Sequence, residues 1–260
     1  MPNLPAHLHL ALQAQARLCS PLLERHLGPY LLGSTAPDIR AMTRGRRDNT
    51  HFGPLSVERI GVGPETLLRL YPHLADPARV GDATRAFVAG YISHLVADEA
   101  WIIHVYRPYF GDRTLLPNDR QANLWDRAVQ LDLDRRAWDE IGDLAWLRDR
   151  LARAEEGVEV DFLDPDLLAR WRERVTDFAR HEFSWERLRF MARRLFGEGD
   201  AETLELVEAF LGDVPGTMGR IYRLVPRPTV DAFWETALAE FLRIGGGYLG
   251  LKSCPGARPG

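Results

Sequence analysis

The sequence predicts a mainly α protein, folded as a single multi-helix bundle. Apolar residues recur at helical spacing in several long segments, and no segment shows a convincing alternation of period two. With 260 residues and 45% hydrophobic content, the chain is long enough to bury a sizeable core. We therefore expect one helical domain over residues 1–252, followed by a flexible tail over residues 253–260.

The first predicted helix covers residues 5–26, with apolar positions such as Leu8, Leu12 and Leu18 at near-helical spacing. Pro21 breaks or kinks this run, and Ser20 is a candidate cap for the helical residues after the break. Residues 27–63 are punctuated by glycine and proline, which predicts a loop-rich segment. Its apolar content favours a packed loop over a disordered one.

A short helix is expected over residues 64–71, opened by Pro64. The longest helical pattern covers residues 77–106 and ends near Pro108, because the residue before a proline disfavours the α conformation. The remaining helices are predicted over residues 118–137, 138–155, 164–196 (interrupted near Ser184 and opened by Asp164-Pro165), 201–212 and 228–245 (ended by Gly245-Gly246-Gly247).

Composition narrows the classes of function and the compartment. The formal net charge is −4 and the sequence pI is near 6.1, so no overall basic excess indicates a nucleic-acid partner. Cys19 and Cys254 form no Cys-x-x-Cys pattern, which argues against a disulfide framework and predicts a reducing, cytoplasmic location. We expect neither a signal peptide nor a transmembrane helix.

His94 and Asp98 are the most informative pair of residues. They are four positions apart in an apolar segment, so on a helix both side chains leave the same face, about 40° apart. An imidazole and a carboxylate presented together suit a zinc-type ion. The alternative is a hydrogen-bonded structural pair, since burial of either group requires a partner.

Other candidate ligands lie in the first 104 residues, which hold His7, His9, His51 and His104. His7 and His9 point to different helix faces, so at most one of them reaches a common site. His51 is a ligand or a loop histidine packed against a neighbouring ring, and Asp38 is a ligand or a turn residue. His104 lies about 240° round the helix from Asp98 and shares its face only if the helix ends or bends first.

Taken together, these segments resemble the zinc-dependent phospholipase C family, which includes bacterial phospholipase C and is related in fold to the fungal single-strand nucleases. The pieces that carry the resemblance occur in the family order: Pro5-Ala6-His7-Leu8, Gly33-Ser34-Thr35-Ala36-Pro37-Asp38-Ile39, Thr50-His51-Phe52-Gly53, Phe87 to Asp98, and His104. Singly these motifs are weak, but their order and spacing are fairly specific. The resemblance covers roughly residues 1–135.

The resemblance implies a fold, a set of ligands and a reaction. Carried over, it assigns Asp38, His51, His94 and Asp98 to one zinc ion. Asp98 would bridge to a second zinc that also takes His7, and His104 would belong to a third. The implied reaction is attack of a zinc-activated hydroxide on the phosphorus of a lipid or small-molecule phosphodiester, with Asp38 as candidate general base.

Two departures from the family pattern bear on the number of metal ions. The best-known secreted members use their mature N-terminal residue as a ligand, exposed by removal of a leader that we do not expect here. Their third site also takes a histidine and a glutamate from the next helix, whereas residues 118–134 hold no histidine. Asn123, Asp126 or Asp132 could substitute, but two zinc ions are the safer expectation.

Several alternatives stay open from the sequence. The chain is either this hydrolase or a non-catalytic helical binding or scaffold protein with a vestigial or structural metal site. Four arginines in one loop either recognise phosphate or are simply solvated: Arg40, Arg44, Arg46 and Arg47. Five aromatic residues either line a choline-type cage or belong to the core: Tyr91, Trp101, Tyr106, Tyr109 and Phe110. The oligomeric state is not predicted.

Overall fold

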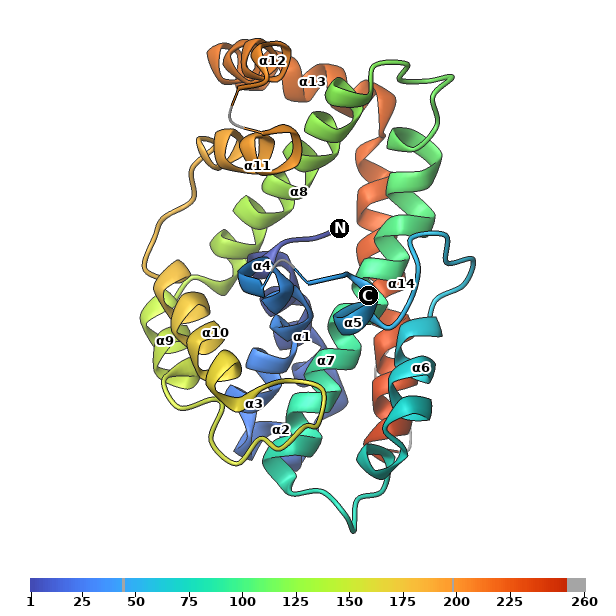
Figure 1. Cartoon of the computed structure of the whole chain (residues 1–260), viewed down its shortest axis with the longest axis vertical. Helices are drawn as coiled ribbons and strands as arrows, with labels where there is room; N and C mark the ends of the chain where they lie inside the picture. Colours follow the sequence, from blue (N-terminus) through green and yellow to red (C-terminus); the bar gives the residue numbers. More distant parts are fainter. Residues whose placement is uncertain (44, 198, 252–260) are drawn as a thin grey trace.

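A computed structural model describes residues 1–43, 45–197 and 199–251, and within these ranges the protein is built from helices without a strand (Figure 1). The α-helices are α1 Leu4–Leu18, α2 Pro21–Arg25, α3 Leu27–Gly33, α4 Arg40–Thr43, α5 Asp48–His51, α6 Val62–Leu70, α7 Asp82–Trp101, α8 Asp119–Ile141, α9 Leu144–Leu151, α10 Pro165–Phe178, α11 Arg187–Phe196, α12 Ala201–Gly212, α13 Val214–Leu224 and α14 Arg227–Tyr248. The 3₁₀ turns η1 Ala36–Ile39 and η2 Pro72–Ala75 and the π-helix η3 Ile102–Phe110 complete them. The mainly α multi-helix fold is confirmed.

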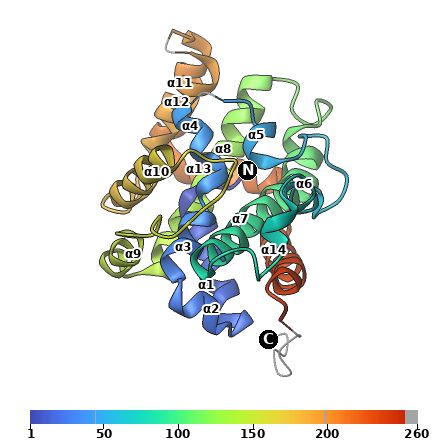
Figure 2. The same cartoon turned by 60° about the horizontal axis from the view of Figure 1, so that its bottom comes forward.

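Helix α7 forms the centre of the bundle. Every residue from Ala86 to Trp101 is buried, and α7 packs most extensively against α3 and α14, as the two views of the cartoon show (Figures 1 and 2). Together with η3 this segment is long and apolar enough to cross a membrane, yet 94% of an apolar 18-residue stretch within it is buried inside the protein. That environment is typical of the core helix of a globular fold.

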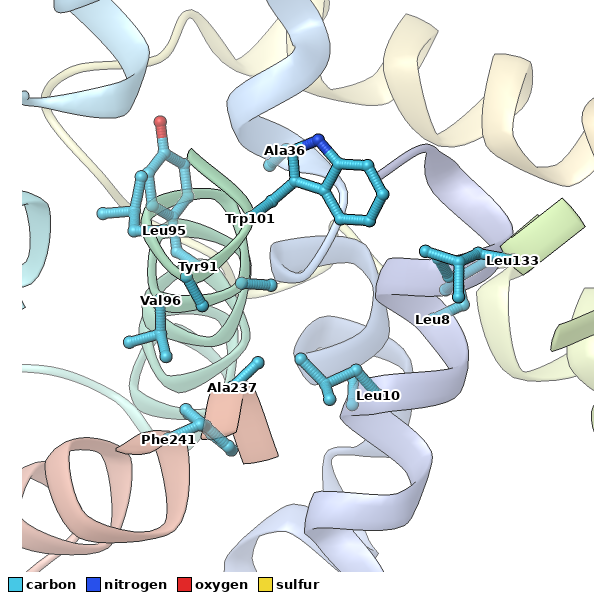
Figure 3. Close-up of a cluster of buried hydrophobic side chains, with 14 of the residues drawn as sticks. Leu8, Leu10, Ala36, Tyr91, Leu95, Val96, Trp101, Leu133, Ala237 and Phe241 are labelled. Carbon is cyan, nitrogen blue, oxygen red and sulfur yellow. The ribbon is translucent and has the colours of Figure 1, made fainter. Parts of the chain in front are cut away.

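The hydrophobic core surrounds α7 on several sides (Figure 3). Tyr91 and Trp101 project from α7, Phe241 reaches in from α14, and Leu8 and Leu10 come from α1. All five side chains are at most 1% exposed. Burial of apolar surface stabilises a fold by about 25 cal/mol per Å², so these large side chains contribute strongly to the stability of the bundle. Their packing fixes the position of α7 and therefore of its polar residues.

Two glycines allow α3 and α7 to cross at very short range. A Cβ atom at Gly33 would lie 2.0 Å from the carbonyl oxygen of Phe87, and one at Gly90 would lie 1.9 Å from that of Tyr30. Only a residue without a side chain fits either position. The crossing also brings the chain after Gly33, which includes Ser34 and Asp38, against the buried face of α7.

Some predicted boundaries are wrong, and each error has a physical reason. Residues 27–63 are not mainly loop: α3, η1, α4 and α5 lie there, and Gly28 and Gly33 serve close helix contacts rather than turns, whereas Gly61 does lie in a turn, with a φ of 103°. The predicted break at residues 137–138 does not occur, since α8 runs on to Ile141 and stops at Gly142, whose φ is 66°. The triple glycine does not end α14, which continues to Tyr248. Helix α13 has no counterpart among the predicted helices.

Other boundaries agree with the structure. Ser20 caps α2 by accepting a hydrogen bond from the backbone N–H of Leu23, and Asp164 caps α10 in the same way through Leu167. The expected interruption near Ser184 separates α10 from α11. The tail predicted for residues 253–260 lies outside the described residues, as does Arg44.

Candidate metal centre

Three imidazoles converge on the carboxylate of Asp98. Its Oδ2 atom lies 3.2 Å from His51 Nε2 and 3.7 Å from His94 Nε2, and its Oδ1 atom lies 3.5 Å from His7 Nε2. None of the four side chains is more than 2% exposed. Asp38 approaches from the side, with Oδ1 3.9 Å from His51 Nε2 and a side chain that is 28% exposed.

Four separate elements supply these side chains. His94 and Asp98 share one face of α7, as their spacing predicts, and His51 is the last residue of the short helix α5. His7 lies on α1 and stacks on His94 with ring centroids 3.7 Å apart. Asp38 is carried by η1, next to Pro37.

The structure separates His7 from His9. The imidazole of His9 packs on Trp234 of α14, with ring centroids 5.2 Å apart, and lies outside the cluster. His7, two residues earlier, turns inward and is 1% exposed. His7 is therefore the N-terminal histidine that the structure brings to the cluster.

Hydrogen bonds behind two of the imidazoles fix their orientation. His94 Nδ1 lies 2.9 Å from the carbonyl oxygen of Ser34, so this nitrogen must carry the proton and Nε2 presents its lone pair to the cluster. His51 Nδ1 lies 3.0 Å from Thr50 Oγ1. Tyr91 in turn donates its hydroxyl proton to the backbone carbonyl of Thr50, at 2.5 Å. The sequence alone singles out neither Ser34 nor Thr50, although Thr50 directly precedes a candidate ligand.

Electrostatics favours the protonation states that bind a cation. Burial, reinforced by the neighbouring imidazole of His7, holds the pKa of His94 well below its ordinary value, so this ring is neutral. Burial raises the pKa of Asp98, but the opposing effect of His94, His51, His7 and Arg47 is larger and holds that pKa well below its ordinary value. A neutral imidazole beside an ionised carboxylate is the form in which these groups bind metal.

The cluster fits a metal ion because it leaves polar atoms unsatisfied. His7 Nε2, His51 Nε2, His94 Nε2 and Asp98 Oδ1 are all buried and have no hydrogen-bond partner of acceptable geometry. Leaving such atoms buried and unpaired costs free energy that a shared cation would recover. Among the described residues, two groups have ligand atoms close enough to hold an ion: His7 with His94 and Asp98, and Asp38 with His51 and His94.

Arg47 also reaches this centre. Its Nη1 and Nη2 atoms lie 3.3 and 3.2 Å from Asp98 Oδ2, and its side chain is 13% exposed. The sequence indicates Arg47 only as one of a loop cluster, and of that cluster Arg46 pairs instead with Asp48 at the surface. The guanidinium of Arg47 provides the positive charge that the buried carboxylate requires.

The third predicted site is not assembled. His104 is exposed, lies outside both ligand groups of the described chain, and lines a separate cavity with Thr229 and Phe233 of α14. Helix α7 ends at Trp101 and passes directly into the π-helix η3, and on this segment His104 is not brought to the His51–His94–Asp98 cluster.

The three possible substitutes on α8 are occupied by other partners. Asn123 donates to the carbonyl of Asp119 at 2.7 Å. Asp126 accepts from Trp101 Nε1 and Gln130 Nε2, at 3.0 and 2.7 Å. Asp132 is paired with several cationic and hydroxyl groups, namely Arg135, Arg136, Arg227 and Tyr222. Of the aromatic residues considered for a choline-type cage, Tyr91, Trp101 and Phe110 are fully buried in the core, whereas Tyr106 and Tyr109 are partly buried and pack against it.

The fold and the site define a helical protein with a buried histidine–aspartate centre suited to a divalent metal. A sequence profile described as Zinc dependent phospholipase C matches residues 6–147, more than half of the 260-residue chain. The chain belongs to the zinc-dependent phospholipase C family. No curated protein and no solved structure matches it.

A cavity of about 840 Å³ opens beside the centre and includes Asp38 in its lining. At its inner end Asp134 of α8 is 1% exposed and accepts a hydrogen bond from Asn3 Nδ2 at 2.9 Å, while its Oδ1 atom is buried without a partner. Burial raises the pKa of Asp134 to about 7, although Asn3 and Arg187 act in the opposite direction. Much of this carboxyl population is therefore protonated at neutral pH.

This raised pKa predicts how stability depends on pH. Between its ordinary value of 3.8 and about 7, folded Asp134 keeps a proton that the unfolded chain loses, so its contribution to stability falls as pH rises through this window. Asp134→Asn removes the effect. We expect the stability of the variant relative to wild type to rise between pH 4 and 7, by up to about 1.4 kcal/mol per pH unit. Urea unfolding at several pH values measures the free energy of unfolding of both proteins. The same pH dependence in the two proteins would contradict the prediction.

Proposed function

We propose that the protein is a metal-dependent phosphodiester hydrolase with phospholipase C-like chemistry. The observation that carries this proposal is the convergence of three buried, unsatisfied imidazole nitrogens on Asp98, within 3.2–3.7 Å of its oxygens. Family membership supports the same class of reaction. Lipid or small-molecule phosphodiesters are the proposed substrates.

Two zinc ions are proposed. Asp38, His51, His94 and Asp98 would hold one, and His7 and Asp98 would hold the other, because His94 Nε2 has a single lone pair and can serve only one ion. This donor set of imidazole nitrogens and carboxylate oxygens is the one that zinc prefers in hydrolases. When bound, zinc supplies positive charge for the phosphoryl oxygens and acidifies a water molecule.

The side chains of the cluster have two proposed roles, proton transfer and exclusion of water. Asp38 is the one carboxylate of the cluster that is partly exposed, at 28%, and it faces the cavity, so it is placed to take a proton from the attacking water. The buried Asp98, His51 and His94 exclude bulk water and hold the centre. In the proposed reaction the water oxygen bonds to phosphorus, the bond from phosphorus to the glycerol oxygen breaks, and that oxygen takes up a proton.

His94→Ala tests the proposal. The variant loses a zinc ligand and the ring on which His7 stacks, so both candidate ligand groups are disrupted, and we expect stoichiometric zinc in wild type and less than about 0.2 zinc per chain in the variant. Hydrolysis of bis-p-nitrophenyl phosphate should fall by at least about 100-fold. Metal analysis and initial rates measure both. His9→Ala serves as the matched control, because His9 lies on α1 but packs on Trp234, outside the centre.

A second function is supported by one observation. The guanidinium of Arg47 already neutralises Asp98, and no described residue of the third site stands in for the missing histidine, so the centre has features of a vestigial one. A helical binding or scaffold protein with a vestigial site would have this arrangement. Wild-type protein that takes up less than about 0.2 zinc per chain after supplementation, and hydrolyses no phosphodiester, would contradict the hydrolase proposal and favour this second function.

A further inference from the structure

The cavity beside Asp38 is rich in arginine, although the chain as a whole carries a net charge of −4. Five arginines from four helices line it, against two carboxylates, those of Asp38 and Asp134. The arginines are Arg40 on α4, Arg127 on α8, Arg174 on α10, and Arg187 and Arg194 on α11. Positive charge from separate elements is therefore concentrated at one place.

These arginines also lack acidic partners. Within the described part of the chain, none of the five lies within 4.0 Å of a carboxylate oxygen, whereas other arginines, such as Arg120 with Asp200, form close ion pairs. Arg40 Nε and Arg187 Nη1 are buried and make no hydrogen bond. Unpaired, partly buried guanidinium groups are costly, so an anion in the cavity would stabilise them.

The rim of the same cavity is apolar. Phe190 and Leu195 of α11 line it and are 60% and 43% exposed, which places them among the few large hydrophobic side chains at the described surface. Deeper in the cavity, Phe178 stacks under the guanidinium of Arg187, with 4.2 Å between ring centroid and Cζ. A ligand that fits must combine anionic groups with an apolar part.

We propose that this cavity selects phospholipids whose headgroup carries a second anionic group, such as a phosphomonoester, in addition to the scissile phosphodiester. The inference rests on the proposed hydrolase function and names its substrate class. The arginines would bind the second anionic group, and Asp38 and the metal centre would face the phosphodiester. The apolar rim of the cavity, Phe190 and Leu195, would contact the acyl chains. A quaternary ammonium headgroup would be repelled by the same five charges.

Most of the selecting residues lie outside the part of the chain that the family profile matches. The family match ends at residue 147, whereas Arg174, Arg187, Arg194 and the apolar rim lie beyond it, on α10 and α11. Headgroup choice is thus assigned to elements outside the matched region. The metal ligands all lie within it.

The test compares a lipid that carries a second phosphate with two lipids that lack it. Zinc-loaded full-length protein is assayed on dioctanoyl phosphatidylinositol monophosphate, dioctanoyl phosphatidylinositol and dioctanoyl phosphatidylcholine, with release of dioctanoylglycerol as the readout. We expect kcat/KM to be at least about 10-fold higher for the monophosphate, as charge-assisted hydrogen bonds to one additional anion provide. Arg174→Gln and Arg194→Gln, both at exposed positions, should each reduce this preference by about fivefold.

A matched control lies on the same helix. Arg189 also belongs to α11 but pairs with Glu186 and Glu208 and does not line the cavity, so Arg189→Gln should leave the preference unchanged. Phe190→Ser should lower kcat/KM for the lipid but not for deacylated glycerophosphoinositol monophosphate. That arm distinguishes a lipid from a soluble phosphate ester as the occupant.

The outcomes separate this inference from the proposed function. Hydrolysis of bis-p-nitrophenyl phosphate and phosphatidylcholine without preference for the monophosphate would overturn the inference and leave the hydrolase function standing. An unchanged preference in both arginine variants would also overturn it. Hydrolysis of no phosphodiester would end both proposals, and faster cleavage of a single-stranded oligonucleotide than of any lipid would replace the lipid class by nucleic acid.

Discussion

Replacing Asp98 with asparagine is expected to abolish metal binding and to lower phosphodiesterase activity by more than about 100-fold. Substituting a residue that only supports a metal ligand typically lowers metal affinity or activity by about 10–100-fold. The effect at Asp98 should be larger, because the imidazoles of His7, His51 and His94 all converge on its carboxylate. The amide oxygen is a weaker ligand and carries no charge. Zinc content and kcat/KM on bis-p-nitrophenyl phosphate measure the loss.

This substitution also leaves Arg47 without its partner, and breaking a buried ion pair costs about 3–5 kcal/mol in known cases. Circular dichroism must therefore show that the variant folds. If it does not, His51→Gln tests the same centre without removing the carboxylate. His104→Ala is the matched control, because His104 is exposed and lies outside both ligand groups of the described chain. Full activity in the Asp98→Asn protein would refute the proposed centre.

Gly90→Ala should be the most destabilising single-methyl change in the bundle. The added Cβ would lie 1.9 Å from the carbonyl oxygen of Tyr30 and 2.8 Å from the backbone nitrogen of Ser34, neither of which yields as a flexible side chain does. The two helices must separate, and we expect a loss of about 3 kcal/mol or more in the free energy of unfolding. Denaturant titration followed by circular dichroism measures it.

The control for this prediction is Gly219→Ala in α13. Gly219 is exposed and a Cβ atom there would have open space, so the substitution should stabilise the protein by about 0.5–1 kcal/mol through helix propensity. Opposite signs for the two glycine variants would show that packing, not propensity, sets the cost at Gly90. Equal effects would contradict the close helix crossing.

Local signals explain which parts of the fold are predictable. The bounds of α12 agree with the prediction, because both signals lie in the local sequence. Asp200 caps the start of the helix, and apolar residues follow it at helical spacing. The prediction for residues 27–63 is wrong because Gly33 serves a contact with a helix more than 50 positions away. Nothing in the local sequence distinguishes such a residue from a turn glycine.

In the candidate metal centre, too, local sequence predicts some features and tertiary packing decides the others. The shared face of His94 and Asp98 follows from helix geometry, whereas the approach of His7, His51 and Asp38 depends on tertiary packing and is expected only through the family resemblance. The expected place of His104 in a third site requires the helix to end or bend after Asp98 in a way that returns this side chain to the same face. The π-helical continuation leaves that side chain facing α14 and solvent.

One backbone atom links packing to chemistry. The Ser34 carbonyl that sets the tautomer of His94 comes directly after α3, and the position of α3 is fixed by the glycine contacts against α7. A substitution that shifts this crossing by a few tenths of an ångström would therefore alter the hydrogen bond that orients His94, the proposed zinc ligand. Stabilising substitutions are better placed away from the contact between α3 and α7.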